Sequence, residues 1–398
     1  MPGWKRTYWS VWSANLITAI GMMSFLPFFP SYLEQLGLSE RAEIATWAGV
    51  IFGAAPFSAA FMAPVWGALG DRFGRKLMTA RAMVAITVFV GCMGFATSPL
   101  QLLFLRLGQG VFSGFVAPSI TLVSVAAPAD RQGQVTGSLQ TALGLGAVIG
   151  PALGGLVGST VGLRYVFFGV AVASSVSALL VALLARERKS DRRAAGGETT
   201  PAGVLRGAAR DLRQVWANPH MRGVLVLTFW LMFGMGATNP LLEIHVGDLT
   251  GAGEKEVARL TGLLFSVMAI VNIVALPCWG RVGDRVGHRE ALSWCVVLSS
   301  AALFLHALAP TLVVLFVVRA LLGASVAGAT PLAYGLAAAE IPVDRRGGAF
   351  GALFGARTLA LSTASMLGGL LSRWVGIRGL FAAGAALVLL SMFSVRRR

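Results

Sequence analysis

Five ionisable residues stand inside long apolar segments of this sequence, or at their ends. They are Glu34, Arg106, Glu243, Arg319 and Arg357. Charged side chains are costly within a membrane, so such positions are functional candidates. A carboxyl group can take up and release a proton, and a guanidinium there needs a partner from another helix or from a ligand. The candidate chemistry is therefore proton coupling and charge recognition, since no catalytic Ser/His/Asp arrangement is legible in the sequence.

Each of these residues also has a plainer structural interpretation. Arg106 and Arg319 could be tied to backbone carbonyls, and Glu34 and Glu243 could be solvated helix ends. Arg357 is balanced between a transport role and a structural one.

The four histidines are scattered along the chain. His245 follows Glu243 by two residues, about 200° around a helix, so the two act together only if the helix breaks near Pro240. We interpret the lone His306 as interfacial.

The elements that position these residues are membrane-spanning helices. Hydrophobic residues make up 56% of the 398 residues and charged ones 13%, whereas a soluble domain has about a quarter charged. The mean hydropathy is +0.73. Apolar segments of this length can cross a hydrocarbon core of ~30 Å as helices. We therefore predict an all-α membrane protein with about twelve spans, at 10–33, 45–68, 77–97, 100–123, 134–158, 164–185, 222–244, 259–281, 289–309, 311–336, 347–371 and 376–395.

The net charge of +16 does not indicate nucleic-acid binding, because Lys and Arg gather in alternate connections between the spans. This bias is the positive-inside rule, and it predicts that both termini are cytosolic. The three cysteines, Cys92, Cys278 and Cys295, lie in or at the ends of apolar segments. No pair has metal-ligand spacing, so we interpret them as packing residues and predict no metal site.

The chain repeats itself at a nearly constant offset. Gly67, Asp71 and Arg72 recur as Gly280, Asp284 and Arg285, and 280 − 67 = 213. Because six spans separate the copies, the halves share one orientation and form parallel repeats. We predict an N-terminal six-helix bundle at 1–185, a charged cytosolic linker at 186–221, which includes a short surface helix near its end, and a C-terminal bundle at 222–398.

The repeated loop resembles the cytosolic signature of the major facilitator superfamily. The resemblance implies a gating loop that locks the outward-facing state, formed by Gly67, Asp71, Arg72, Gly74 and Arg75 and by Gly280, Asp284 and Arg285. A second motif resembles the antiporter motif of drug efflux members, and it comprises Gly146, Gly150, Pro151, Gly154 and Gly155. Together with the segment Leu26–Gly37, the motifs resemble proton-coupled multidrug exporters of the MdtG type.

This resemblance implies proton-coupled export of small lipophilic or amphiphilic molecules by alternating access, in a bacterial inner membrane and by a functional monomer. The energy source is a proton gradient and no cofactor is expected, since the sequence has no nucleotide-binding Gly-rich motif. Alternatives within the superfamily are a metabolite uniporter or symporter and a lipid or lysophospholipid transporter. In the family, helices one, four, seven and ten line the substrate cavity, where they offer Asn15, Met22, Phe25, Phe112, Phe115, Phe229, Trp230, Phe233, Asn239 and Tyr334.

The gating loop gives a first prediction. Asp71→Asn removes a charge-assisted hydrogen-bond acceptor, so the variant is expected to transport poorly while folding normally. Flux into proteoliposomes, measured alongside the yield and elution profile of the purified variant, checks this. Normal flux would rule out a latch at Asp71.

Overall fold

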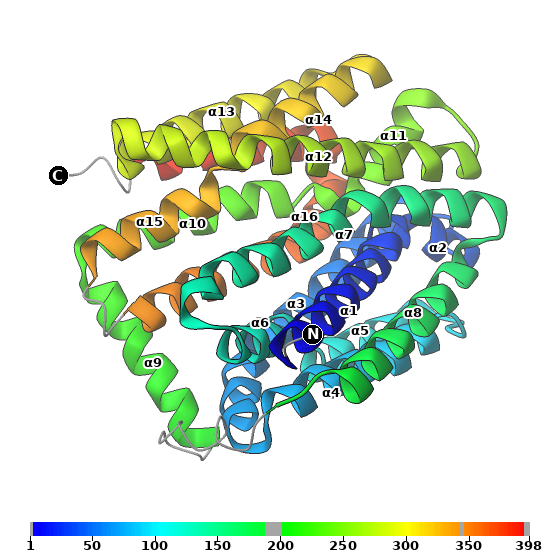
Figure 1. The fold of residues 1–398 in the computed structure, drawn as a ribbon. Coiled ribbons are helices and arrows are strands. Elements are labelled where there is room, and N and C mark those ends of the chain that lie inside the picture. Colours follow the sequence, from blue (N-terminus) through cyan, green and yellow to red (C-terminus); the bar gives the residue numbers. More distant parts are fainter. Residues whose placement is uncertain (1–2, 188–200, 342–345, 394–398) are drawn as a thin grey trace. The chain divides into compact units, whose positions relative to one another are not determined.

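The computed structural model describes residues 3–187, 201–341 and 346–393, and in these ranges all regular structure is helical (Figure 1). The predicted all-α class is confirmed. The helices, in chain order, are α1 (Gly3–Phe25), α2 (Phe29–Gln35), α3 (Arg41–Phe73), α4 (Arg75–Met93), α5 (Pro99–Phe112), α6 (Val116–Ala126), α7 (Gln132–Thr160), α8 (Leu163–Leu184), α9 (Pro201–Ala217), α10 (Pro219–Gly236), α11 (Leu242–Thr250), α12 (Glu254–Val286), α13 (His288–Leu308), α14 (Leu312–Val326), α15 (Ala329–Glu340) and α16 (Arg346–Ser391), with short 3-10 turns at Leu26–Phe28, Ala129–Arg131 and Asn239–Leu241.

Eleven segments of the described chain are long and apolar enough to cross a membrane. Ten of them correspond to the first ten predicted spans. The eleventh, Ala349–Ser391, is 43 residues long and contains the last two predicted spans. Inside it Gly376 has a non-helical backbone, with φ 70° and ψ 165°. The helix therefore breaks at the first residue of the predicted twelfth span, which accounts for twelve spans.

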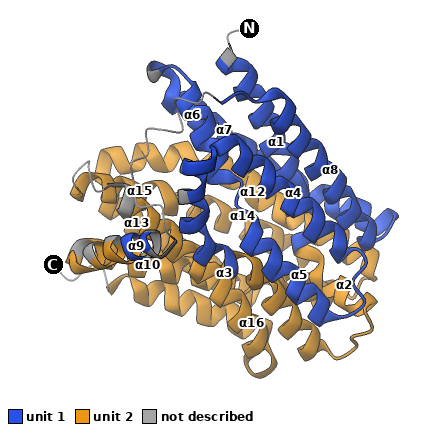
Figure 2. Cartoon of the chain, turned by 90° about the horizontal axis from the view of Figure 1, so that it is seen from below, with its two compact units in different colours: residues 1–26, 58–207 blue, residues 27–57, 208–398 orange. Residues whose placement is uncertain are grey.

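The chain forms two compact units by packing (Figure 2). Unit 1 comprises residues 1–26 and 58–207, and unit 2 comprises 27–57 and 208–398. The first part of α3 thus packs with the C-terminal residues. The division into 1–185, 186–221 and 222–398 concerns sequence repeats, which are a different property from packing, so it stays a prediction.

Close helix approach through glycine organises unit 1. Helix α1 packs against α7 and α8, and α4 packs against α8. A Cβ added at Gly150 would lie 2.6 Å from the Ile20 carbonyl oxygen, and one at Gly154 would overlap the Ser24 carbonyl oxygen. The antiporter motif therefore lies on the face of α7 that contacts α1, where only glycine lets the two backbones approach.

Unit 2 uses the same device. Helix α10 packs against α16, and α13 and α14 pack against each other. Gly49 of α3 faces Gly369 of α16, and a Cβ at Gly49 would lie 2.8 Å from the Gly369 Cα. Gly236 and Gly368 mark another such approach, between α10 and α16. Small residues let these helices approach closely.

The repeat is visible in the backbone. Glycines with positive φ recur at the repeat offset: Gly74 (φ 103°) with Gly287 (φ 93°), and Gly162 (φ 116°) with Gly376 (φ 70°). Side chains repeat too. Trp66 Nε1 donates to the Val111 carbonyl at 2.6 Å, and Trp279 Nε1 donates to the Ala324 carbonyl at 2.7 Å. Both members of that pair are displaced by 213 residues, so the two halves share one scaffold in detail.

Helix α9, from Pro201 to Ala217, is the short helix predicted near the end of the linker. The charged run that precedes it, residues 188–200, lies outside the described residues.

The glycine contacts give a second prediction. Gly154→Ala should destabilise the protein by about 1–3 kcal/mol, because the added methyl group overlaps the α1 backbone. Gly137→Ala, in the same helix with open space at its Cβ, should be neutral or stabilising, since alanine is the better helix former. Thermal unfolding of both purified variants measures the difference. Equal melting temperatures would contradict the packing argument.

Candidate functional site

Four of the candidate spans are interrupted by non-α-helical backbone. Span one breaks at Leu26–Phe28, between α1 and α2, and span four breaks at residues 113–115, between α5 and α6. Span seven breaks at residues 237–241, between α10 and α11, and span ten at residues 327–328, between α14 and α15. Non-helical backbone at membrane depth occurs where it is buried in protein or lines an aqueous cavity. These four spans are the ones expected to line a substrate cavity.

A buried carboxyl group lies just beyond the break in span seven. Glu243, in the first turn of α11, has 2% of its surface exposed. Its Oε1 accepts a hydrogen bond from the Ser31 hydroxyl at 2.7 Å, and its Oε2 accepts one from the Ser31 backbone N–H at 3.1 Å. Ser31 lies in α2, just beyond the break in span one. Both partners belong to unit 2, and both oxygens of the carboxylate are satisfied by neutral donors.

A polar cavity of about 300 Å³ adjoins this pair. Glu34, Arg41 and Glu254 line it together with Ser31 and Glu243. Arg41 forms an ion pair with Asp248 and also donates to the Ile244 carbonyl at 3.2 Å. Gln35 donates to Glu254 at 2.6 Å. The predicted candidates Glu34 and Glu243 therefore lie at one cavity, and Glu34 is exposed while Glu243 is buried.

In unit 1, Arg106 lies buried near the middle of α5. Its guanidinium donates to Gln109 Oε1 at 2.6 Å and lies 5.8 Å from the centroid of the Phe25 ring. Gln109 in turn donates to the Met22 sulfur at 3.1 Å. The structure thus joins Arg106, Met22 and Phe25 in one cluster around Gln109, which connects span four to span one.

The two candidate arginines of unit 2 also have neutral partners. Arg319 is 1% exposed and donates to Asn239 Oδ1, at the break in span seven, at 3.1 Å. Arg357 donates to Thr330 Oγ1 at 3.0 Å. Asn239 therefore serves as an arginine ligand in this structure.

The remaining cavity candidates fall into separate groups. In unit 1, Asn15 is buried and donates to Ser119 Oγ at 2.9 Å, and Phe115 is also buried. Phe112 stacks on Phe89 at 5.8 Å between ring centroids, away from the Arg106 cluster. In unit 2, the rings of Phe229, Trp230 and Phe233 contact one another, with centroid distances of 5.3 to 5.9 Å. Tyr334 lies apart from them, beside Phe350.

The gating-loop residues lie at the junctions of α3 with α4 and of α12 with α13. Gly74 and Gly287 occupy corresponding turns with positive φ. The N–H groups of Arg75 and Lys76, at the start of α4, donate to Glu187 at 2.7 and 3.4 Å, which places an anion where a helix N-terminus favours one. Gly67 and Arg72 lie in the last two turns of α3, and Gly280, Asp284 and Arg285 lie in the last two turns of α12. The Asp71 side chain lies outside the described part of the chain, so its role stays a prediction.

Two predictions from the sequence were wrong, those for His306 and for two of the cysteines. His306 is not interfacial: it is fully buried, stacks on Phe381 at 5.0 Å and contacts the Ala302 carbonyl at 2.8 Å. The expected separation of Glu243 and His245 is found: span seven breaks beside Pro240, both residues follow the break within α11, and His245 faces Phe381 and not the Glu243 site. Cys92 and Cys278 are exposed, and of the three cysteines Cys295 alone packs in the interior.

Several residues that hydrogen-bond to the candidate charges were not themselves predicted as site residues. Ser31, Gln109 and Thr330 are ordinary polar residues in sequence, and only their contacts distinguish them. Arg81 gave a signal, because it is a cation inside a predicted span. Its guanidinium carbon lies 3.4 Å from the centroid of the Trp66 ring, and none of its nitrogens has a hydrogen-bond partner among the described residues. Within the described ranges, no group of His, Cys, Asp or Glu is arranged to hold a metal ion.

Solved transporters share this architecture. The chain superposes on a nucleoside transporter, NupG, with a TM-score of 0.78 at 14% identity, covering 98% of this chain and 100% of that one. It also matches the human organic anion transporter MFSD10, with a TM-score of 0.73 at 17% identity and full coverage of both chains. At these identities the likeness concerns the fold alone.

Sequence comparisons extend over nearly the whole chain. It is 30% identical to the multidrug resistance protein MdtG of Dickeya zeae (strain Ech586), covering 99% of this chain and 96% of that protein. The MdtG protein of Proteus mirabilis (strain HI4320) is also 30% identical, covering 98% and 94%. The family model for the Major Facilitator Superfamily matches residues 11–258 and 224–398. The chain is thus an integral membrane transporter that belongs to the Major Facilitator Superfamily.

Proposed function

We propose that this transporter exports small lipophilic or amphiphilic compounds in exchange for protons, by alternating access. The similarity to MdtG multidrug resistance proteins over nearly the full chain supports export of varied compounds. The buried Glu243 carboxyl beside a polar cavity carries the proton-coupling part of the proposal. The Major Facilitator Superfamily also includes transporters of other kinds, and the flux experiment below separates them.

Glu243 has the properties that a proton carrier needs. It can titrate, it is buried in a span, and its hydrogen bonds come from neutral Ser31 groups rather than from an arginine. The basic side chain that lines the cavity, Arg41, is engaged by Asp248. The polar cavity beside Glu243 provides a path along which water could deliver a proton.

Proton binding at Glu243 would change the contact that joins α2 to α11. An ionised carboxylate accepts from both Ser31 donors, and hydrogen bonds to a charged acceptor are about twice as strong as neutral ones. A protonated carboxyl has one oxygen occupied by its own hydrogen, so it holds Ser31 less firmly. We infer that protonation loosens α2 from α11, two segments that directly follow the breaks in spans one and seven.

The membrane and the orientation belong to the same proposal. Lys and Arg gather in alternate connections, which favours cytosolic termini in a bacterial inner membrane by the positive-inside rule. Each compact unit has its own glycine-mediated packing, which is consistent with a functional monomer.

The third prediction tests proton coupling. A growth-inhibition screen in an efflux-deficient host identifies an exported compound, whose uptake is then followed in proteoliposomes with an acidic lumen. Uptake should accelerate as protons leave, and it should lose this acceleration when an ionophore collapses the pH gradient. Uptake that is indifferent to the gradient would indicate a uniporter, and uptake driven by an acidic exterior would indicate a symporter.

Two variants assign the coupling to a residue. Glu243→Gln keeps the size of the side chain but cannot ionise, so it should retain binding of the compound and lose the dependence on the gradient. Glu256→Gln is the matched control, because Glu256 is a half-exposed acid in the first turn of α12 that pairs with Arg259. A gradient response in Glu243→Gln equal to that of the control would move the proton site elsewhere.

The fourth prediction concerns the Ser31–Glu243 contact itself. Ser31→Ala removes the hydroxyl donor from a buried carboxyl, and it should lower the free energy of unfolding by about 1–3 kcal/mol. Ser39→Ala, at an exposed position that lines the same cavity, should change it little. Thermal unfolding of both variants, alone and combined with Glu243→Gln, gives the coupling energy. Additive effects of Ser31→Ala and Glu243→Gln would show that the contact is absent in the protein.

A further inference from the structure

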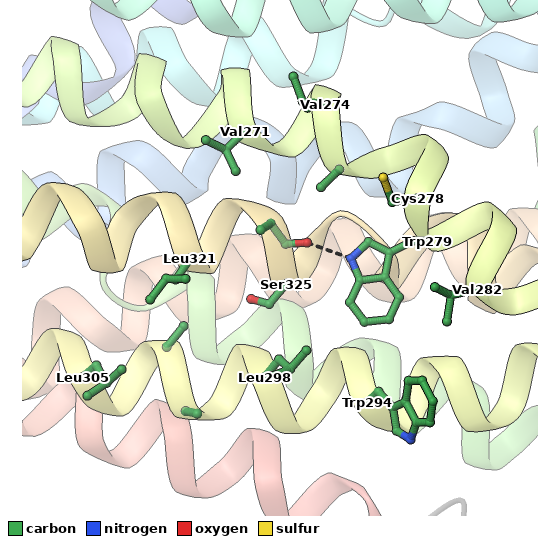
Figure 3. A pocket seen from close by; sticks show the side chains of 14 residues that line it. Val271, Val274, Cys278, Trp279, Val282, Trp294, Leu298, Leu305, Leu321 and Ser325 are labelled. Atoms are coloured by element: carbon green, nitrogen blue, oxygen red, sulfur yellow. Dashed lines mark hydrogen bonds between the residues drawn. The ribbon is translucent and has the colours of Figure 1, made fainter. Parts of the chain in front are cut away.

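Unit 2 contains an apolar cavity that the proposed transport mechanism does not use. It has a volume of about 630 Å³ and lies between α12, α13 and α14 (Figure 3). This volume is in the usual range of ligand sites. Its walls are aliphatic and aromatic. Four lining side chains carry a polar group, namely Cys278, Trp279, Trp294 and Ser325. Two of these groups are bonded to backbone, because Trp279 Nε1 donates to the Ala324 carbonyl and Ser325 Oγ donates to the Leu322 carbonyl. The cavity therefore suits a purely apolar group.

The repeat explains why the cavity exists. The positions that correspond to Ala302 and Ser325, 213 residues earlier, are Phe89 and Phe112. In unit 1 these two rings stack, 5.8 Å apart and 11° from parallel. In unit 2 both rings are replaced by small side chains, and both small residues line the cavity. One half thus fills with its own side chains a space that the other half leaves open.

The cavity opens onto the outer face of the spans. Val274 is 68% exposed, and Leu298, at 52%, is similarly accessible. Both residues lie in membrane-spanning helices. Apolar side chains exposed on membrane-spanning helices contact lipid, so lipid acyl chains are the groups most abundant at the opening of the cavity.

One end of the cavity carries arginines. The lining positions of α12 recur every three or four residues up to Val282, and the same face continues to Arg281 and Arg285. Both arginines are exposed, and neither has a hydrogen-bond partner among the described residues. Two exposed acids, Asp284 and Glu290, lie at this end as well. The position corresponding to Arg281 in the first half is Ala68, so the half with the open cavity also has the additional cation.

We propose that this cavity binds one phospholipid, with an acyl chain between α12, α13 and α14 and the phosphate at Arg281 and Arg285. Guanidinium groups at the end of an apolar inter-helical groove match the charge of a phosphate. The inference does not depend on proton coupling or on the identity of the exported compound.

The test uses the full chain in nanodiscs with three photoactivatable lipids that carry a diazirine on the acyl chain: phosphatidylglycerol, phosphatidylethanolamine and diacylglycerol. After irradiation, mass spectrometry maps the labelled peptides. Label from the phospholipids should concentrate on 271–282, 294–305 and 321–325, and exceed that on the corresponding face of the first half, 58–69, 81–92 and 108–112. Equal labelling of both faces would reduce the site to ordinary surrounding lipid and overturn the proposal.

Variants separate the two parts of the site. Ala302→Phe with Ser325→Phe restores the ring pair of the first half, and label on unit 2 should fall to the level of the first half. Arg281→Gln with Arg285→Gln should lower labelling by both phospholipids and leave labelling by diacylglycerol unchanged. Arg259→Gln, at the other end of α12, is the control. Diacylglycerol labelling equal to that of the phospholipids in the unaltered protein would overturn the role of the phosphate.

A measurement on the unaltered protein avoids any folding defect in the ring variants. Cys278 lines the cavity, and the exposed Cys92 lies in the first half, where the rings fill the space. Removal of lipid should speed maleimide labelling of Cys278, and added phosphatidylglycerol should slow it again, relative to Cys92. Protection of Cys278 by an exported compound instead of by phospholipid would make the cavity a drug site and overturn the lipid assignment.

Discussion

A charged or polar group in the hydrocarbon layer has to find its hydrogen bonds inside the protein, and much of this structure follows from that constraint. Glu243 is satisfied by Ser31, Arg106 by Gln109, and Arg319 by Asn239. In each case the partner is neutral. Ser31 and Asn239 lie near helix breaks, and Gln109 lies one turn from Arg106 in the same helix. A charge held by neutral groups can change its protonation or its ligand without leaving an opposite charge stranded. Such sites therefore suit a protein that must change state.

Hydropathy, charge bias and internal repetition predicted the spans, the twelve-helix count and the shared scaffold, because these properties are local or periodic along the chain. The antiporter glycines could also be predicted, since close helix packing has a sequence signature. The partner of Glu243 could not. Ser31 lies 212 residues away, and its contact depends on how α2 and α11 rotate about their axes, which hydropathy does not encode. His306 was placed wrongly for the same reason, because its burial depends on Phe381 in a distant helix.

The two halves show which features tolerate divergence. The indole hydrogen bonds of Trp66 and Trp279 are the same in both, and so is the turn geometry at Gly74 and Gly287. The charges differ, since Glu243 and Arg357 have no counterpart of the same type in the first half, where the offset positions are Pro30 and Gly144 or Leu143. The space between helices differs as well, through the ring pair that only one half retains.

The turn glycines that recur at the repeat offset also matter for how such a chain can evolve. The backbone conformation at a few glycines sets where each helix begins and ends. The residues between two such turns can therefore be substituted without moving the ends of the helix. Their side chains can change, as Phe89 and Phe112 differ from Ala302 and Ser325, while the course of the chain stays the same. Duplication then supplies two copies of each segment, and one copy can keep the original packing while the other acquires a new ligand.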